Sequence, residues 1–275
     1  MKGTRGNAIG LIAGEGRFPF LVAQGIRHEG YRLVVAGFRQ HTSEKLYALS
    51  DRMIWLRLGQ LGKLLSFFKD NGVDQVVFAG PINKPRAMGM IPDLRATRLL
   101  FQIRSRHDGE IFQGLIRTLN SEGIGVLSPL SFVPDLKTPE GTLSRRKPNK
   151  NEEADISFGW HLAKQIGNLD IGQCIVVKDQ IVIAVEAVEG SDATILRAGE
   201  LAGSGCVVLK VFKPGQAETI DQPAVGLQTI RTMIQAGASC LALEAEAGLF
   251  FDRQDAIDLA DAHDISVVGY PSEEG

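Results

Sequence analysis

Cysteine is scarce in this sequence, and its spacing excludes two common roles. The chain of 275 residues has three cysteines, Cys174, Cys206 and Cys240, and none belongs to a CxxC pair. A zinc site or a disulfide framework is therefore not expected. Each cysteine stands among small or β-branched apolar residues, which predicts three buried, reduced thiols. An odd number of cysteines without a disulfide pattern is typical of the cytosol.

Long apolar runs are also missing. No stretch reaches the roughly 18 consecutive apolar residues that a membrane-spanning helix needs. The first residues, MKGTRGNAIGLIAGEG, hold a short apolar segment broken by glycine and no small-residue cleavage site, which is unlike a signal peptide. We therefore expect a soluble, cytoplasmic protein.

The chain has no large excess of charge of either sign. It has 30 Lys and Arg residues against 32 Asp and Glu residues, a balance that argues against a general nucleic-acid binder. Residues 84–106 are a local exception, because Asp93 is their single acid before residue 107 and Leu99, Leu100 and Ile103 lie among the basic residues. The interpretations that stay open are a solvated helix face, or a surface that lies at a membrane or at the mouth of a site for acyl chains. The basic residues are Lys84, Arg86, Arg95, Arg98, Arg104 and Arg106.

Two nucleotide-binding signatures are absent. No Gly-Lys-Ser/Thr occurs, so there is no Walker A motif. In GLIAGEGRFP, Pro19 stands where a dinucleotide fingerprint has its third glycine, and the second β-rich run ends in Gly-Phe-Arg without a carboxylate for a ribose. An NAD-dependent oxidoreductase is therefore a disfavoured alternative.

What the sequence does contain is a regular alternation of β-rich runs and helical patterns. Over the first 130 residues this alternation predicts βαβ units and a mostly parallel, Rossmann-like sheet. Four prolines and a polar tail interrupt it between residues 129 and 152. Two β-rich runs that flank Lys178-Asp179-Gln180 then predict a hairpin. We expect two α/β domains: an N-terminal nucleotide-binding domain (1–132), a linker (133–152) and a C-terminal mixed α/β catalytic domain (153–275).

Glycines follow two of the predicted strands in the first domain. Gly14 and Gly16 stand between the first strand and the first helix, where small residues let a backbone approach a phosphate. The stretch AGPINKPRAMG (79–89) follows another strand and supplies Lys84. In open α/β sheets ligands bind beyond the carboxyl ends of the strands, so both loops are expected at one crevice. A tight turn without a ligand and a solvated lysine are the alternatives.

Three acidic side chains come directly after the apolar run IVIAV: Glu186, Glu189 and Asp192. Strand alternation places Glu186 on the face of Val182 and Ala184, opposite Ile181, Ile183 and Val185. A carboxylate on an apolar face is costly unless a cation or a donor meets it. Asp192 has a second interpretation as a helix cap.

A basic segment precedes another acid further along the chain. Lys210, Lys213 and Gln216 come before Asp221, which stands near the start of a predicted helix. Asp221 is either a cap or part of a site for a phosphate and its metal. None of the five histidines is spaced for a metal, and His41 is assigned an ordinary surface role; oxygen ligands alone point to Mg²⁺. His107 precedes Asp108 and Glu110, which are open to a role in the crevice or as helix caps.

These motifs together resemble the LpxI-type UDP-2,3-diacylglucosamine pyrophosphatases of lipid A biosynthesis. The similar stretches are LIAGEGRFP, GPINKP, LDIGQCIVV, AVEAVEGSDATILRAG, VLKVFKPGQ and DQPAVG, and they run from about residue 8 to 270. The resemblance implies a substrate cleft between two domains, a Mg²⁺ requirement, a possible homodimer, and hydrolysis of the diphosphate to UMP and 2,3-diacylglucosamine 1-phosphate. A non-catalytic nucleotide-sugar binding protein is the further alternative.

The resemblance also implies roles for individual residues. The aspartate of the DxPxxG motif falls on Asp221, which would orient the attacking water or bind the metal. This chain departs from the family pattern at Ala217 and Thr219, and around residue 108, where the family tends to carry paired aspartates. The roles assigned are catalysis for Asp221, Glu186, Lys210 and Lys213; substrate binding for Gly14, Gly16, Lys84, Asp192, Gln216 and Thr194; and metal binding for Asp221, Glu189 and Asp108.

Overall fold

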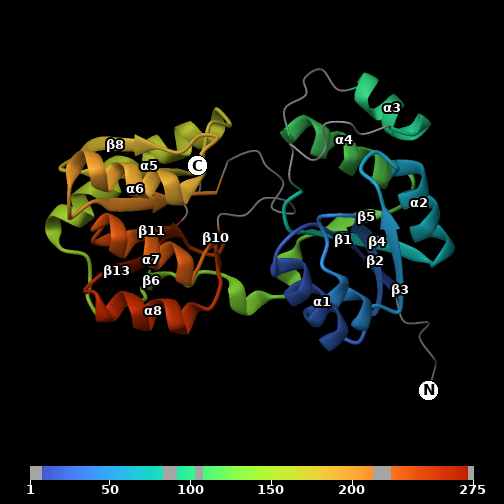
Figure 1. Ribbon diagram of the computed structural model, residues 1–275, viewed down its shortest axis with the longest axis horizontal. Helices are drawn as coiled ribbons and strands as arrows, with labels where there is room; N and C mark the ends of the chain where they lie inside the picture. Colours follow the sequence, from blue (N-terminus) through green and yellow to red (C-terminus); the bar gives the residue numbers. More distant parts are fainter. Residues whose placement is uncertain (1–7, 83–91, 103–107, 213–223, 272–275) are drawn as a thin grey trace. The chain divides into compact units, whose positions relative to one another are not determined.

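The computed structural model describes residues 8–82, 92–102, 108–212 and 224–271 (Figure 1). The described chain divides into an N-terminal unit that ends at Pro134 and a C-terminal unit that begins at Asp135. Among the sequence-predicted site residues, Lys84, Lys213, Gln216 and Asp221 lie outside the described residues, as does the side chain of Asp108.

The N-terminal unit is built on one five-stranded sheet, in which every pairing is parallel. The strand order is β3-β2-β1-β4-β5, an order used by doubly wound nucleotide-binding sheets, and it reverses direction between β1 and β4. All six residues of β1 are buried, as expected of a parallel strand that is covered on both faces. The strands are β1 (Ala8–Ala13), β2 (Arg32–Phe38), β3 (Arg52–Leu56), β4 (Val73–Ala79) and β5 (Gly125–Leu127).

Helices cover both faces of this sheet. The core on one face includes Ile26 of α1 and Leu46 of η1, and the core on the other includes Phe68 of α2, Ala96 of α3 and Leu119 of α4. Burial of each large apolar side chain of this kind stabilises the fold by about 1.5–3 kcal/mol. The helices are α1 (Phe18–His28), η1 (Glu44–Ala48), α2 (Leu61–Asp70), α3 (Leu94–Gln102), α4 (Asp108–Ser121) and η3 (Pro129–Ser131).

The C-terminal unit contains a mixed sheet of six strands in the order β6-β13-β11-β9-β7-β8. Its centre, β13, β11 and β9, is parallel, whereas β7, β8 and β6 run antiparallel to their neighbours. Two short strands, β10 and β12, form a separate parallel pair. The strands are β6 (Gly141–Thr142), β7 (Cys174–Lys178), β8 (Ile181–Val185), β9 (Val207–Lys210), β10 (Ala224–Val225), β11 (Cys240–Glu244), β12 (Leu249–Phe250) and β13 (Ser266–Tyr270).

Helix α5 lies on one face of the mixed sheet, and α6, α7 and α8 lie on the other. Trp160 of α5 belongs to the first core, whereas Ile195 of α6, Met233 of α7 and Ala260 of α8 belong to the second. The apolar faces of four helices therefore bury both sides of one sheet, which is a three-layer arrangement. The helices are α5 (Lys150–Asn168), α6 (Ser191–Ala202), α7 (Leu227–Ala236) and α8 (Arg253–Ala262), and η4 (Pro134–Leu136) precedes them.

The predicted hairpin is confirmed, but the predicted alternation along its second strand is wrong. Asp179 and Gln180 have φ of 51° and 58°, as a type I′ turn requires, and they join β7 to β8. The register shifts between Val176 and Val177. Because of this irregularity, Val182 packs in the α5 core while Ala184 packs in the opposite core.

The segment 133–152, predicted as a linker, carries η4, β6 and the first turn of α5. An Asn149 side chain and the carboxylate of Glu152 form a capping box at the start of α5. Every helix in the described ranges is too short or too polar to traverse a bilayer.

Candidate functional site

Two loops meet at the carboxyl end of the N-terminal sheet, where its strand order reverses. The N–H of Gly14, after β1, donates to the carbonyl of Ala79 at 2.8 Å, and the N–H of Glu15 donates to Pro81 at 2.8 Å. A Cβ atom at Gly14 would overlap the carbonyl oxygens of Gly80 and Pro81. The glycine at position 14 is therefore required by contact between the two loops.

Gly16 is required for a different reason. Its φ is +86°, in the left-handed region that glycine occupies at little cost, and the space around its Cα is open. The chain turns at this glycine and enters α1 one residue after the N-cap, Arg17. A substitution at Gly16 would strain the backbone even though no atom obstructs it.

A buried histidine faces the glycine loop. His41 Nδ1 lies 2.7 Å from Oε1 of Glu15, and the His41 side chain is 2% exposed while that of Glu15 is 30% exposed. Thr42 beside it donates to the carbonyl of Ala13 and accepts from the N–H of Phe38. The surface role predicted for His41 is wrong, because the turn after β2 folds back onto the loop after β1.

At the carboxyl end of the C-terminal sheet, Lys210 is the last residue of β9 and is only 5% exposed. Its Nζ donates to the carbonyl of Ala224 at 2.8 Å. Ala224 stands three residues after Asp221 in the DQPAVG motif. Two motifs that the sequence separates by a basic segment are therefore in contact at this edge.

Glu186 is buried at the same edge, and donors meet both of its oxygens. Oε1 accepts from the Ser191 hydroxyl at 2.9 Å, and Oε2 accepts from the N–H of Gln173 at 3.1 Å. The N–H of Glu186 donates to the carbonyl of Cys174, so the chain still follows β7 at this point. Sequence analysis missed Ser191 and Gln173, although the buried carboxylate requires a donor.

The pKa of the buried Cys174 thiol responds to the charged side chains at this edge of the sheet. Burial raises the pKa of Cys174 to about 12, Lys210 lowers it, and Glu186 and Asp192 raise it. The Lys210 ammonium and these two carboxylates therefore each act on the same buried thiol. All three cysteines are free and buried, as the sequence predicts, and burial also raises the pKa of Cys206 and Cys240.

Glu189 and Thr194 hold the turn between β8 and α6. The Glu189 carboxylate forms an ion pair with Arg197 at 2.7 Å and accepts from the N–H of Ala187. Its pKa is lowered by its own backbone N–H, by Arg197 and by Ala187. The Thr194 hydroxyl is buried and donates to Gly190 at 3.0 Å. Asp192 is exposed in the first turn of α6, and it is not the cap, because Gly190 is.

A second buried carboxylate, Glu244 at the end of β11, fixes the chain where β9 ends. Both of its oxygens lie 2.6 Å from Lys164 Nζ, and Oε2 accepts from the N–H of Phe212 at 2.6 Å. Lys164 also donates to the carbonyl of Phe212 at 3.4 Å. Both backbone polar groups of Phe212, the residue before Lys213, are thus bound by one ion pair. Sequence analysis missed it, because its members stand eighty residues apart.

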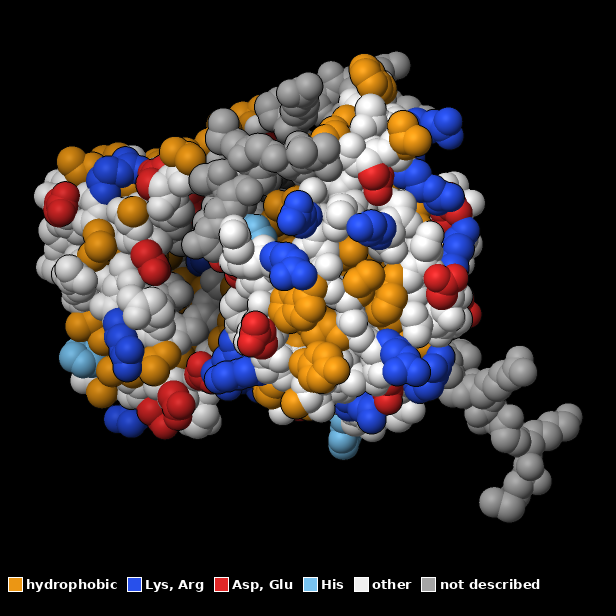
Figure 2. All heavy atoms as spheres, turned by 45° about the vertical axis from the view of Figure 1, so that its right-hand side comes forward, with side chains coloured by type: hydrophobic (Ala, Val, Ile, Leu, Met, Phe, Trp, Pro, Cys, Tyr) orange, Lys and Arg blue, Asp and Glu red, His pale blue; other side chains and the backbone are white. Residues whose placement is uncertain are grey.

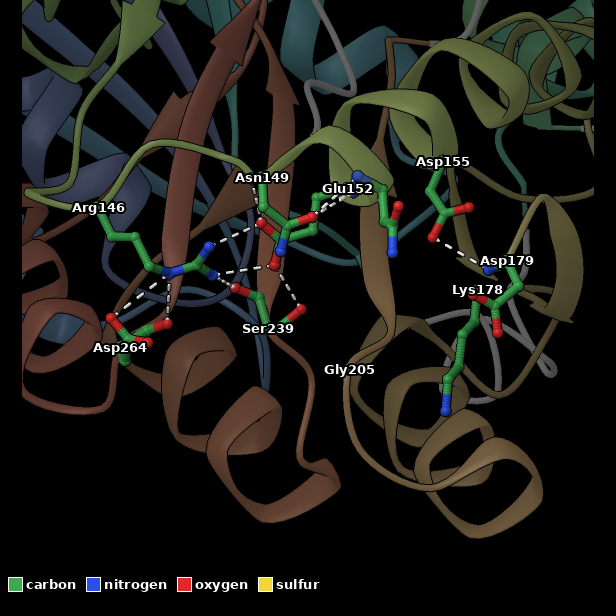
Figure 3. A pocket seen from close by; sticks show the side chains of 10 residues that line it. Arg146, Asn149, Glu152, Asp155, Lys178, Asp179, Gly205, Ser239 and Asp264 are labelled. Carbon is green, nitrogen blue, oxygen red and sulfur yellow. Dashed lines mark hydrogen bonds and ion pairs between the residues drawn. The ribbon is translucent and has the colours of Figure 1, made fainter.

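The opposite end of the same sheet carries a polar cavity of about 380 Å³ (Figure 3). Arg146 forms an ion pair with Glu152 at 2.7 Å, and the Ser239 hydroxyl donates to Glu152 at 2.6 Å. Asp155 accepts from the N–H groups of Asp179 and Gln180 and so fixes the hairpin turn. These polar side chains connect the amino ends of the strands to α5.

The described acids at the carboxyl end of the C-terminal sheet offer the type of ligand atom, oxygen, that hard cations bind. The thiol at this end, Cys174, stays protonated at neutral pH. Among the described residues, no three His, Cys, Asp or Glu side chains are grouped to hold a metal ion. Asp221 and the side chain of Asp108 are not among those residues.

The two units define a class of α/β proteins with a glycine loop at the carboxyl end of one parallel sheet and buried charged side chains at that end of the other, the edge where open α/β sheets commonly bind ligands. Within that class the chain belongs to the LpxI family. The model of the LpxI N-terminal domain matches residues 8–136, and that of the LpxI C-terminal domain matches residues 139–268. The resemblance inferred from the motifs is confirmed.

One relative is similar along its whole length. The UDP-2,3-diacylglucosamine pyrophosphatase LpxI of Caulobacter vibrioides is 30% identical over 280 residues, which cover 97% of this chain and 98% of that protein. Carboxylases and a synthetase among the solved structures share only 10–13% identity with this chain. The biotin carboxylase domain of the Hydrogenobacter thermophilus 2-oxoglutarate carboxylase shares 10% identity, covers 65% of this chain and 36% of its own, and has a TM-score of 0.30. Scores at that level do not show a common fold.

Proposed function

We propose that the protein hydrolyses the diphosphate of UDP-2,3-diacylglucosamine, yielding UMP and 2,3-diacylglucosamine 1-phosphate in lipid A biosynthesis. The observation that carries this proposal is the match of both LpxI domains along the chain, together with the 30% identical relative that bears this activity in its name. Fold alone would not support a reaction, because one fold serves many chemistries.

The described residues support the proposal through Lys210. A buried ammonium beside the DQPAVG motif acts at low dielectric, where a charge interacts more strongly than it does in water. Lys210 and, as we propose, Lys213 stabilise the negative charge that develops on the phosphate oxygens. Glu186 is held by Ser191 and Gln173, so its contribution is a fixed negative charge at this edge.

The reaction itself exchanges one P–O bond for another. The oxygen of a water molecule bonds to one phosphorus of the diphosphate, and the bond from that phosphorus to the bridging oxygen breaks. We propose that Asp221 orients this water and accepts its proton. The departing phosphate takes the bond's electron pair, and Lys210 offsets its charge.

Mg²⁺ is part of the proposal. Asp108 would hold it, with Asp221 as the alternative ligand if that residue does not orient the water, whereas Glu189 would first have to leave its ion pair with Arg197. When bound, the ion would neutralise charge on the diphosphate oxygens. Asp192, exposed near the same thiol as Lys210 and Glu186, is a substrate-binding residue in this scheme, together with Gln216, Lys84 and the glycine loop.

The acyl chains of the substrate imply work at the cytoplasmic surface of the inner membrane. Helix α3 supports this part of the proposal, because Leu94, Arg98 and Phe101 are exposed on it at helical spacing. Figure 2 shows hydrophobic side chains at the upper end of the N-terminal unit, the height at which Figure 1 draws α3. Leu99 instead packs against the core, so it does not belong to this face.

The test is direct. The purified protein is incubated with UDP-2,3-diacylglucosamine and Mg²⁺, and the release of UMP is measured by chromatography. The expected result is turnover that stops with EDTA and returns with added Mg²⁺. If the protein bound UDP-2,3-diacylglucosamine but released no UMP, it would be a binding protein. If EDTA did not change the rate of UMP release, the proposed role of Mg²⁺ would be wrong.

A further inference from the structure

The glycine loop of the N-terminal unit lacks the donors that a phosphate cradle needs at two of its positions. The N–H groups of Gly14 and Glu15 both donate to carbonyl groups of the loop after β4, at 2.8 Å each. A phosphate bound by a glycine loop depends on N–H groups that point at the ligand. These two N–H groups already donate to carbonyl groups of the protein and are not available to a phosphate. The close packing of the loop therefore has a role other than phosphate binding.

What the loop presents at the carboxyl end of the sheet is a carboxylate with a fixed orientation. Glu15 is 30% exposed, and one of its oxygens lies 2.7 Å from His41 Nδ1, which is almost completely buried. An ionised carboxylate only accepts hydrogen bonds, so Nδ1 carries the proton. Hydrogen bonds of Thr42 to Ala13 and Phe38 fix the turn that bears His41. The following helix, α1, begins three residues later and adds the positive end of its dipole.

We propose that Glu15 binds the hydroxyl groups of the ribose of the nucleotide and that His41 is its positioning residue. This inference rests on the proposed function, which supplies the uridine nucleotide. A carboxylate accepts hydrogen bonds from two neighbouring hydroxyl groups and repels a phosphate, so its position selects the sugar. In dinucleotide-binding sheets the ribose acid follows the second strand. Here the turn after β2 supplies His41, and the acid comes from the loop after β1.

The first experiment uses the wild-type protein and three probes: UMP, 2′-deoxy-UMP and 3′-deoxy-UMP, each titrated by calorimetry. A hydrogen bond to a charged group predicts that UMP binds about 10-fold to 100-fold more tightly than at least one deoxy analogue. Glu15→Gln should lower UMP affinity by a similar factor and lower the affinity for that deoxy analogue less, because the analogue has lost one of the two hydroxyl groups that Glu15 binds. If Glu15→Gln is unstable, Glu15→Asp replaces it in the titrations. This variant keeps the charge but shortens the side chain, so it should also lower the affinity for UMP.

Glu122→Gln is the matched control. Its carboxylate belongs to the same unit, is 25% exposed and pairs with Lys69 and Arg95, but it stands between α4 and β5, at the amino end of the sheet. This variant should bind all three probes as the wild type does. His41→Ala should lose the discrimination between the probes, and His41→Gln, whose amide still donates to Glu15, should keep most of it.

Two results would overturn the inference: equal affinity of the wild type for UMP and both deoxy analogues, or failure of UMP to bind. An equal loss of affinity for every probe in Glu15→Gln would do the same, because it would indicate a structural role. A protein that discriminates the probes but releases no UMP from UDP-2,3-diacylglucosamine would overturn the proposed function and leave the ribose site standing.

Discussion

Lys210 and Glu186 are buried charges in the C-terminal unit, and they differ in how their partners are arranged. Glu186 accepts hydrogen bonds from Ser191 and Gln173. Lys210 donates to one backbone carbonyl, that of Ala224. An ammonium has three N–H donors, so Lys210 has donors left for a ligand besides the one that meets this carbonyl.

Asp221→Asn tests the acid at the centre of the proposed chemistry. The substitution keeps the size of the side chain but removes the charge that would accept a proton or hold Mg²⁺. We expect kcat to fall at least ~100-fold, the low end for a positioned acid–base group, while binding of UMP is retained. Steady-state kinetics and calorimetry measure the two effects. If Asp221 were only a helix cap, asparagine would replace it with little change in turnover.

Glu152 gives a prediction for stability against pH. Burial alone would raise the pKa of Glu152, but hydrogen bonds from Arg146, Ser239 and the N–H of Asn149 lower it below its ordinary value of 4.5. A lowered folded-state pKa means that stabilisation is present above the ordinary value and is lost as pH falls through the lowered one. Glu152→Gln should therefore cost about 3 kcal/mol of unfolding free energy at pH 7 and progressively less below pH 4.5.

The control for that measurement is Glu153→Gln in the same turn of α5, where the side chain is exposed. Its unfolding free energy should stay within ~0.5 kcal/mol of the wild type at every pH. Urea titrations between pH 3 and 8 would compare the three proteins. If the loss of unfolding free energy in Glu152→Gln were as large at acid pH as at pH 7, the ionised Glu152 carboxylate would not be its source.

Among the secondary-structure elements, the ends of β9 and β11 are coupled through Phe212. Its N–H and carbonyl are bound by Glu244 and Lys164, directly before the segment that carries Lys213. A buried pair of this kind costs desolvation, and an apolar pair of similar volume is often as stable. We therefore expect it to position the chain that follows β9 rather than only to stabilise the sheet.

Glu244→Gln and Glu152→Gln separate the two roles, because each removes a buried carboxylate from an ion pair at opposite ends of one sheet. Both should lower the unfolding free energy by about 3 kcal/mol. Only Glu244→Gln should also lower kcat, by ~10-fold, because a small displacement of positioned groups slows the reaction strongly. Kinetics on the folded fraction at low temperature would measure this. Equal kcat values for the two variants would show that the pair has no positioning role.

Helix α3 carries the prediction about the membrane. Arg95 forms an ion pair with Glu122, whereas Arg98 is exposed between Leu94 and Phe101. Reversal of the charge in Arg98→Glu should weaken binding to anionic vesicles roughly 10-fold or more, at about 1 kcal/mol per charge. Lys63→Glu, the same change on an exposed position of α2, should bind as the wild type does. Cosedimentation with vesicles measures the binding of the wild type and both variants. Equal binding of all three proteins would contradict the prediction that α3 meets the membrane.

At the scale of the whole molecule, the edge strand of the C-terminal sheet offers a surface through which two copies of the chain could pair. β8 is the last strand of the six, and Ile181 at its start is exposed. An exposed edge strand is a template for pairing with a second chain. We expect sedimentation equilibrium to give twice the chain mass of 29.8 kDa, and Ile181→Lys to shift it toward the monomer. A wild-type mass of one chain would contradict the expected homodimer.

Neither sign of charge prevails in the chain as a whole, although the stretch 84–106 is basic. In the view of Figure 2, Lys and Arg side chains are dispersed among hydrophobic and acidic ones on the N-terminal unit. The mixture of charges on this face agrees with the near balance of 30 basic and 32 acidic residues in the chain.

The sequence by itself determined the fold class, the hairpin and the family. Periodicity of apolar residues separates helices from parallel strands because each geometry repeats its own spacing. The turn Asp179-Gln180 and the runs that flank it are local, so a local pattern sufficed to predict them. Motifs in LpxI order identified the family because they recur nearly from end to end.

Only the tertiary structure decided which distant side chains meet. The burial of His41 against Glu15 and the binding of Phe212 by Lys164 and Glu244 join residues 26 to 80 positions apart. The irregularity between Val176 and Val177, which reverses the faces of β8, has no residue type that marks it. Such contacts depend on how strands are ordered and how loops fold back at their ends, and no spacing along the chain encodes that arrangement.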